Sequence, residues 1–170
     1  MSDFIVPLEK LIEQFRKLPG IGHKTAVRLA FCVLDFSPEE AKSFADAIID
    51  AKEKIHNCEI CQNISDTPIC AICADDKRDK SVICVVEDPK SVMAIEKTRE
   101  YNGVYHVLGG TVSPMNGVGV EQLKIRELVQ RVAENEIMEI IIATNPSLEG
   151  ETTAAYISKL LKLDNRRRLG

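Results

Sequence analysis

Residues 81–89 read SVICVVEDP, and this stretch decides the fold class of the second half of the chain. The run Ser81–Glu87 is rich in β-branched and apolar side chains and lacks the polar alternation of a half-exposed strand. Such a run is typical of a strand buried in a parallel sheet. Pro89 suits the first position of a helix. The stretch therefore predicts a buried strand that leads directly into a helix over Pro89–Glu100.

Two more strand-and-helix pairs follow. Val104–Leu108 predicts a second strand, and Glu121–Asn135 carries the apolar stripe of a helix through Leu123, Leu128, Val129 and Val132. Ile137–Thr144 (IMEIIIAT) predicts a third buried strand, before a final helix over Thr152–Leu163. This alternating order predicts a parallel sheet with right-handed crossovers.

Two CxxC pairs lie upstream of the first strand and are separated by eight residues: Cys58, Cys61, Cys70 and Cys73. Each pair can present two thiolates on a tight turn, and two such turns complete the S4 shell of a structural zinc ion. Redox disulfides and unligated thiols are the alternatives, but a single redox motif would not need the second pair. The other cysteines, Cys32 and Cys84, fall in a predicted helix and a predicted strand, so we expect packed thiols there.

Residues 1–56 predict a small all-helical unit. The first helix has apolar residues at helical spacing from Leu8 to Leu18, and a second helix follows Gly22. Ser37-Pro-Glu-Glu40 then supplies the capping box of a third helix. The expected apolar face of this third helix consists of Ala41, Phe44, Ala45, Ile48, Ala51 and Ile55.

The turn between the first two helices reads LPGIGHKTA over residues 18–26, a helix-hairpin-helix pattern. A GxG turn leaves backbone N–H groups unobstructed beside a helix N-terminus, where they can bind a phosphate without reading bases. The candidate nucleic-acid-binding residues are two glycines and four cations, in a stretch without acidic residues: Arg16, Lys17, Gly20, Gly22, Lys24 and Arg28. An ordinary corner between two helices is the alternative.

Composition limits the possible function classes. The 170 residues include 22 Lys and Arg against 26 Asp and Glu, which gives a net charge of −4. This balance argues against a polybasic nucleic-acid coat, so DNA binding must come from a local patch. The chain shows no basic and apolar leader and no apolar run of membrane-spanning length, so we expect a cytoplasmic protein that does not enter the membrane. In a reducing compartment the cysteines are not expected to form disulfides.

Acidic residues follow two of the predicted strands. Glu87 ends the first strand, and Glu149 and Glu151 follow the third. The carboxyl edge of an open α/β sheet is where ligands bind, and phosphoryl transfer with Mg²⁺ needs several carboxylates there. As an alternative, Glu87 and Glu151 would stabilise the following helices through the helix dipole.

The order of these features resembles the RecR family of bacterial recombination mediator proteins. The resemblance covers residues 1 to about 160 and rests on the cysteine module and four stretches: LPGIGHKTAVRLA at 18–30, VVEDP at 85–89, HVLGG at 106–110 and ATNPSLEGETTAAYI at 143–157. It implies an α+β multi-module fold with an α/β unit of the Toprim type. The expected organisation is a helix-hairpin-helix unit at 1–56, a C4 zinc module at 57–80, a Toprim-like parallel sheet at 81–164 and a tail at 165–170.

The resemblance also implies a non-enzymatic function. In Toprim enzymes a glutamate on the first strand works with an Asp-x-Asp pair after the third; here Glu87 matches the glutamate, but Asn145 and Ser147 occupy the positions of the pair. Proteins of the RecR family are clamps that hold DNA, bind RecO through the Toprim region and RecF more broadly, and help to load RecA onto gapped or single-stranded DNA coated by SSB. Lys24 and Arg28 match the basic positions of the family's DNA-binding hairpin.

We therefore expect a DNA-binding recombination mediator with one structural zinc ion and RecO and RecF as partners. The expected partner-binding residues are Glu87, Glu149 and Glu151. The main alternative is a magnesium-dependent Toprim nuclease or a fragment of a primase or topoisomerase. A zinc-stabilised protein-interaction module is a third hypothesis.

The resemblance further implies a homo-oligomer. The family normally continues past the final helix with another strand and a glycine-rich acidic segment likened to a Walker B motif, whereas this sequence ends with LLKLDNRRRLG. ATP contact and ring closure are partly attributed to that segment, and a separate dimer contact to the N-terminal unit. We therefore expect a dimer that closes into a tetrameric ring only weakly.

Overall fold

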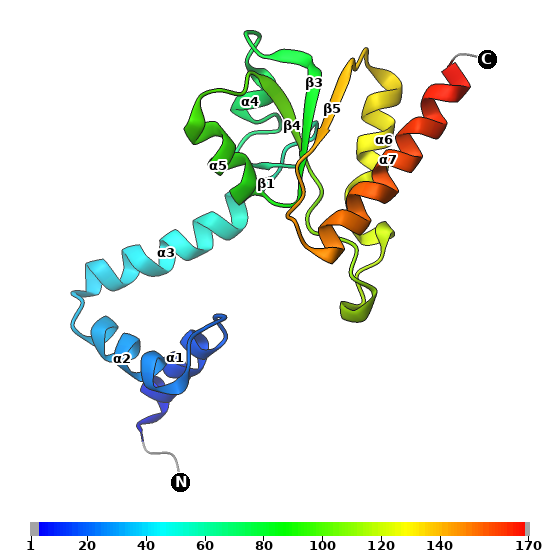
Figure 1. Cartoon of the computed structure of the whole chain (residues 1–170). Coiled ribbons are helices and arrows are strands. Elements are labelled where there is room, and N and C mark those ends of the chain that lie inside the picture. Colours follow the sequence, from blue (N-terminus) through cyan, green and yellow to red (C-terminus); the bar gives the residue numbers. More distant parts are fainter. Residues whose placement is uncertain (1–3, 169–170) are drawn as a thin grey trace. The chain divides into compact units, whose positions relative to one another are not determined.

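The chain divides into two compact units, Met1–Glu53 and Lys54–Gly170. We describe each unit by itself, from a computed structural model (Figure 1). The structure describes residues 4–168, with their side chains up to residue 162. Residues 169–170 of the predicted tail lie outside this range. None of the helices within it is both long enough and apolar enough to span a membrane.

The first unit contains α1 (Val6–Arg16), α2 (His23–Leu34) and all but the last residue of α3 (Pro38–Lys54). The first two helices pack against each other through a small core of Leu8, Ile12, Ala26 and Ala30 (Figure 1). Two alanines on α2 allow this close packing because they carry little volume. The expected packing of the Cys32 thiol on α2 is wrong: the side chain is exposed.

The capping box of α3 forms as predicted, but the expected burial of its apolar face is wrong. The Ser37 N–H donates to Glu40 Oε2 at 2.8 Å, and the Glu40 N–H donates to Ser37 Oγ at 3.1 Å. No residue of α3 is buried, and the side chains of Phe44 and Ile48 are 45% and 59% exposed. Helical spacing shows that a face is apolar; it does not show that the same chain covers it.

The second unit begins with the cysteine module. The short strands β1 (His56–Asn57) and β2 (Ile64–Ser65) pair antiparallel and carry the first CxxC pair between them. The one-turn helix α4 (Ala71–Ala74) follows the third cysteine. The module leads directly into the sheet, because the next strand begins at Asp79.

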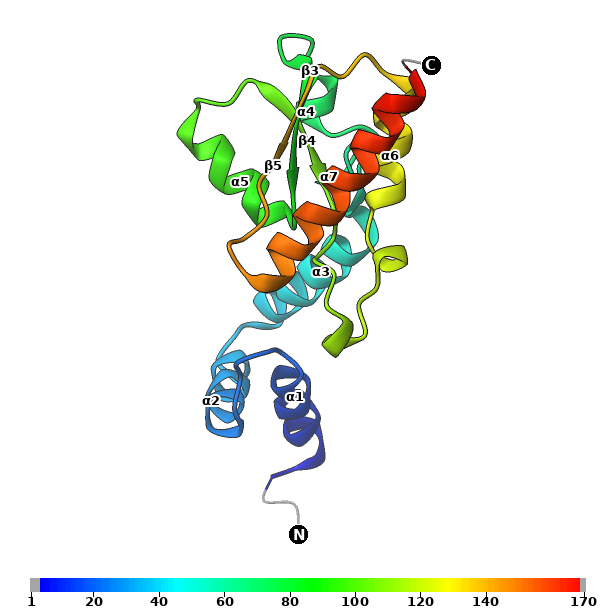
Figure 2. The same cartoon turned by 45° about the vertical axis from the view of Figure 1, so that its right-hand side comes forward.

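A three-layer α/β unit follows, built on the sheet order β4-β3-β5 with parallel pairing. Its strands are β3 (Asp79–Val86), β4 (Gly103–Val107) and β5 (Glu139–Ile142). Helix α5 (Pro89–Thr98) covers one face, and α6 (Ile125–Glu134) and α7 (Leu148–Arg168) lie side by side on the other (Figure 2). The predicted parallel α/β unit and the α+β multi-module fold class are confirmed.

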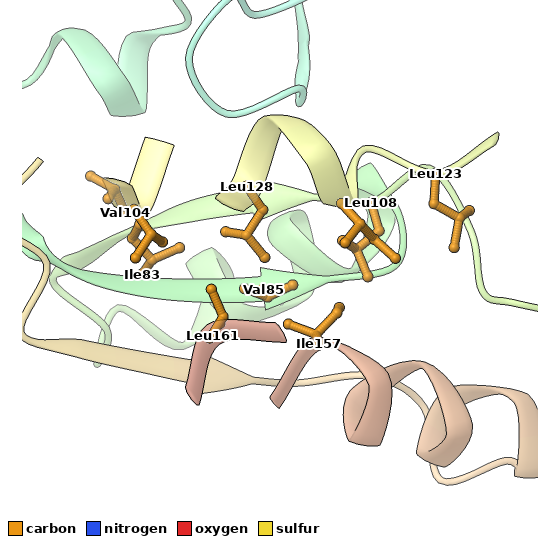
Figure 3. Packing of buried hydrophobic residues seen from close by; sticks show 10 residues of the cluster. Ile83, Val85, Val104, Leu108, Leu123, Leu128, Ile157 and Leu161 are labelled. Carbon is orange, nitrogen blue, oxygen red and sulfur yellow. The ribbon is translucent and has the colours of Figure 1, made fainter. Parts of the chain in front are cut away.

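The core follows from the alternation of side chains along β3. Ile83 and Val85 point toward α6 and α7, where they pack with Leu128, Ile157 and Leu161 (Figure 3). The alternate residues of β3, Cys84 and Val86, point toward α5 and pack there with Val92, Tyr105 and Val107. Both faces of β3 are therefore buried, as its continuous apolar run predicted.

Three details differ from the sequence-based expectation. β5 is an edge strand with an exposed and half-buried pattern, although its run of isoleucines predicted a buried strand. The helix expected over Glu121–Asn135 is divided, with a 3-10 turn at Val120–Gln122 before α6. α7 begins at Leu148, earlier than expected, and extends into the predicted tail as far as Arg168.

Candidate functional site

The helix-hairpin-helix turn exposes backbone donors. Gly20 has a φ of +81°, which glycine adopts at little cost, and the Ile21 N–H closes the turn on Leu18 O at 3.1 Å. Gly22 is the N-cap of α2 and provides no side chain to bond the first N–H groups of the helix. A Cβ added at either glycine would meet no atom within 4 Å, so the turn faces open space.

Four cations surround this turn on α1 and α2. Lys24 and Arg28 are one helical turn apart on α2, and both are exposed. Arg16 lies in the last turn of α1, and Lys17 follows it with its Nζ donating to Gln14 Oε1 at 2.9 Å. All six predicted nucleic-acid-binding residues thus belong to one helical hairpin and are solvent-accessible.

The four cysteines of the zinc module converge. Their side chains are buried, and the four sulfur atoms lie within 4.8 Å of one another. A tetrahedral site with Zn–S bonds of about 2.3 Å places its sulfur atoms roughly 3.8 Å apart. The Sγ atoms of Cys61 and Cys70 are already 3.5 Å apart. The donor set fits one zinc ion, with Cys58, Cys61, Cys70 and Cys73 as its ligands and no position left for substrate.

The electrostatics of the cluster favour a cation. A hydrogen bond with Cys70 raises the pKa of the Cys61 thiol, and hydrogen bonds from Cys61 and Cys73 lower the pKa of Cys70. Four adjacent thiolates without an ion would repel one another. A divalent ion removes that repulsion and takes the place of the protons.

The peptide chain around the cluster is shaped for metal binding. Gln62 has a φ of +62° in the first knuckle, where its N–H donates to Cys58 O at 3.0 Å. The Cys70 N–H points at Cys58 Sγ at 3.3 Å, which stabilises negative charge on that sulfur. Backbone N–H groups of this kind are typical of the outer shell of a structural metal site.

The acidic residues at the carboxyl edge of the sheet do not form one cluster. Glu87 accepts two hydrogen bonds from Asn145, at 2.7 Å from the backbone N–H and at 2.7 Å from Nδ2. Glu149 lines a cavity of about 330 Å³ whose other walls come from Gly109–Thr111, Ser113, Asn116, Val118 and Ser147. Glu151 is exposed in the first turn of α7.

Glu87 is not the hydrogen-bonding cap of α5. The neighbouring Asp88 is the N-cap of α5, and its Oδ1 accepts from the Ser91 N–H at 2.8 Å. That bond lowers the pKa of Asp88. Glu151 does lie in the first turn of α7, where a carboxylate interacts favourably with the helix dipole.

The sequence did not indicate the pairing of Glu87 with Asn145. The two residues are 58 positions apart, and asparagine in an Asn-Pro-Ser turn is ordinarily explained by turn geometry alone. The parallel order of the strands was the available signal, because it brings the ends of β3 and β5 to the same edge.

Three family models match consecutive parts of the chain. They are the RecR helix-hairpin-helix over residues 8–52, the RecR zinc finger domain with four cysteines over residues 55–75, and the Toprim domain over residues 81–168. The chain is therefore of the class that joins a helix-hairpin-helix and a four-cysteine zinc finger to a Toprim domain. It belongs to the RecR family. This membership supports a role in DNA recombination and repair.

Proposed function

We propose that this protein is a non-enzymatic DNA-binding scaffold that acts as a recombination mediator. One observation carries the proposal: the glycine turn between α1 and α2 presents uncapped N–H groups beside four exposed cations, in a chain whose net charge is −4. Such a surface binds phosphates through charge and backbone donors, and phosphate contacts carry no sequence information. DNA binding is therefore expected to be independent of sequence.

The carboxyl edge of the Toprim domain supports the non-enzymatic part of the proposal. Metal-dependent phosphoryl transfer needs carboxylates that converge on one or two cations. Both oxygens of Glu87 instead accept hydrogen bonds from Asn145. Glu149 lines a separate cavity, and Glu151 is exposed on α7. This arrangement favours a scaffold over the magnesium-dependent nuclease considered as the alternative.

We further propose that the carboxyl edge is a protein-binding surface, with RecO and RecF as the partners implied by the family. Two large apolar side chains are highly exposed at this edge: Met115, in the connection after β4, at 99% and Leu148, the first residue of α7, at 77%. Acidic groups stand near them in sequence, Glu149 and Glu151 among them. Apolar anchors beside carboxylates suit a partner surface that carries Arg or Lys. In this proposal the bound partners use the DNA-held scaffold to load RecA onto DNA coated by SSB.

A DNA-cleavage assay run beside a DNA-binding assay tests the proposal. The full chain is incubated with plasmid and single-stranded DNA, with Mg²⁺ or Mn²⁺, and products are compared with binding measured by fluorescence anisotropy. We expect binding without nicking, ligation or primer synthesis. Metal-dependent cleavage that Glu87→Gln abolishes would establish the nuclease instead. RecA loading on SSB-coated gapped DNA, with and without RecO and RecF, then tests the mediator role.

A further inference from the structure

Glu87 joins the loops that follow the two outer strands of the sheet. Its backbone carbonyl accepts from the Gly109 N–H, after β4, at 2.9 Å. Its carboxylate accepts from the backbone N–H of Asn145, after β5, on Oε1 and from the Asn145 side-chain amide on Oε2. Each oxygen of this half-buried carboxylate therefore has its own donor, and both donors come from one residue.

The loop behind Asn145 packs tightly around the pair. A Cβ added to Gly150 would come 2.1 Å from Asn145 O and 3.0 Å from Glu87 Oε1, so only glycine fits there without movement. The Thr144 hydroxyl donates to Gly150 O at 3.0 Å, and the Ser147 N–H donates to Asn145 O at 2.8 Å. These contacts fix the backbone of Asn145 beside Glu87.

We propose that Asn145 is a neutral lock on Glu87, which closes this sheet edge to divalent cations. The amide and backbone N–H groups supply the positive charge density that a cation would otherwise supply to a carboxylate at this position. The inference rests on the proposed non-enzymatic function and assigns it to one side chain. A divalent cation of the Mg²⁺ type prefers oxygen ligands. Replacing the amide donor by a second carboxylate should therefore open the edge to such an ion.

Three variants separate charge from hydrogen bonding. Glu87→Gln removes the charge and keeps both bonds, because Gln Oε1 accepts from the backbone N–H while its Nε2 donates to the turned amide of Asn145. Asn145→Asp removes the donor and sets two carboxylates against each other. The double variant Glu87→Gln with Asn145→Asp keeps the bond from the backbone N–H and restores the side-chain bond with its donor and acceptor exchanged. Asn135→Asp, on an exposed residue elsewhere in the same unit, is the control for added charge.

The test measures thermal unfolding of the full zinc-loaded chain with Mn²⁺ and, for comparison, with a monovalent salt of equal ionic strength. Asn145→Asp should unfold at a lower temperature than wild type in metal-free buffer, and Mn²⁺ should raise its Tm by ~4 °C or more. Titration followed by electron paramagnetic resonance should then show one Mn²⁺ bound per chain. Wild type, Glu87→Gln, the double variant and Asn135→Asp should show no such rise.

Two results would overturn the lock: Mn²⁺ binding by the wild-type chain that Glu87→Gln removes, or an Asn145→Asp chain that does not respond to Mn²⁺. If Asn145→Asp is unfolded without metal, recovery of its folded circular-dichroism spectrum with Mn²⁺ supports the lock, and continued unfolding overturns it. DNA cleavage by the wild-type chain would defeat the proposed function itself. Mn²⁺ binding by wild type without cleavage would defeat the lock alone.

Discussion

The Val107 N–H on β4 donates to the carbonyl of Cys61, a zinc-site cysteine, at 2.8 Å. The same outer edge of β4 receives a second bond, because the Arg131 guanidinium donates to Tyr105 O at 2.7 Å. Ile72 also packs against both the cysteine cluster and the α5 side of the sheet. The zinc module therefore covers a strand edge of the Toprim domain that would otherwise be open for pairing.

Loss of zinc should disturb this sheet edge as well as the module. We predict that Cys58→Ser or Cys70→Ser loses zinc, unfolds residues 57–80 and lowers solubility, because binding of the metal supplies much of the folding free energy of such a module. Hydrogen exchange at the Val107 amide should accelerate in both variants. Cys32→Ser, on an exposed cysteine, should retain one zinc per chain. Protein purified under reducing conditions without chelator and found free of zinc would contradict the prediction.

The proposed DNA-binding role of the hairpin between α1 and α2 predicts that removing its cations lowers DNA affinity uniformly across sequences. Lys24→Ala combined with Arg28→Ala should weaken binding by a similar factor for every DNA tested. Each lost phosphate contact should reduce the magnitude of the negative slope of log K against log salt by ~0.9 on duplex and ~0.7 on single strands. Lys90→Ala with Lys97→Ala removes the same charge from exposed positions on α5 and should leave the slope unchanged. An unchanged slope in the folded hairpin variant would place the DNA site elsewhere.

We predict that the buried side chain of His106 makes the free energy of unfolding depend on pH. The side chain is fully buried on β4, with Nε2 donating to Lys124 O at 2.8 Å, and burial lowers its pKa from 6.5 to about 4. Between these values the unfolded chain binds a proton that the folded chain does not. The stabilisation is therefore complete above pH 6.5 and falls as the pH drops toward 4, by about 3 kcal/mol at most.

Urea unfolding of wild type and His106→Gln between pH 4 and 7 measures this contribution. The variant should show the smaller loss of stability on acidification, since its amide can donate to the same carbonyl and does not titrate. Release of zinc at low pH affects both proteins, so the difference between them isolates the histidine. Equal pH slopes would show that His106 is protonated without cost in the folded chain.

Arg78 forms a second contact between the zinc module and the α/β unit, and we predict that this contact stabilises the fold. Its guanidinium pairs with the Glu96 carboxylate on α5 and also donates to Tyr101 O and Gly103 O, while the Tyr105 hydroxyl donates to Glu96 Oε1 at 2.7 Å. The bond from Arg78 lowers the pKa of Glu96. Arg78→Ala should reduce the free energy of unfolding by about 2 kcal/mol, because it leaves a partly buried carboxylate and two carbonyls without this donor.

A double-mutant cycle with Glu96→Gln measures the energy of the Arg78–Glu96 pair itself. Lys42→Ala is the matched control, since Lys42 pairs with Asp46 on the surface of α3 and should change stability by less than ~1 kcal/mol. If Arg78→Ala were as mild as Lys42→Ala, the network around Glu96 would contribute little to folding.

Features that depend on local spacing were predictable from the sequence. Three such features lie where their patterns predicted: the paired cysteines, the glycine turn and the β-branched run of β3. The geometry of each depends on residues close together in the sequence. Features that depend on a distant neighbour were not. The run of isoleucines in β5 predicted a buried strand, because apolar content does not reveal that, within residues 4–168, β3 alone pairs with it. Likewise nothing in the chain near Glu87 indicates that Asn145 will meet it.

The apolar face of α3 predicts self-association. Phe44, Ile48 and Ile49 are 45%, 59% and 51% exposed. Within the described residues, Phe36 provides the one aromatic ring that contacts Phe44, in an edge-on arrangement. The first unit has few buried side chains of its own, so uncovered residues of this size favour burial against a second copy. We therefore predict a dimer through the first unit.

Ile48→Asp should convert this dimer to a monomer in multi-angle light scattering, whereas Lys52→Asp, on the same helix, should not. A wild-type chain that stays monomeric at tens of micromolar would rule out this contact. A stable tetramer at low micromolar concentration would show that residues 1–170 carry a second interface as well.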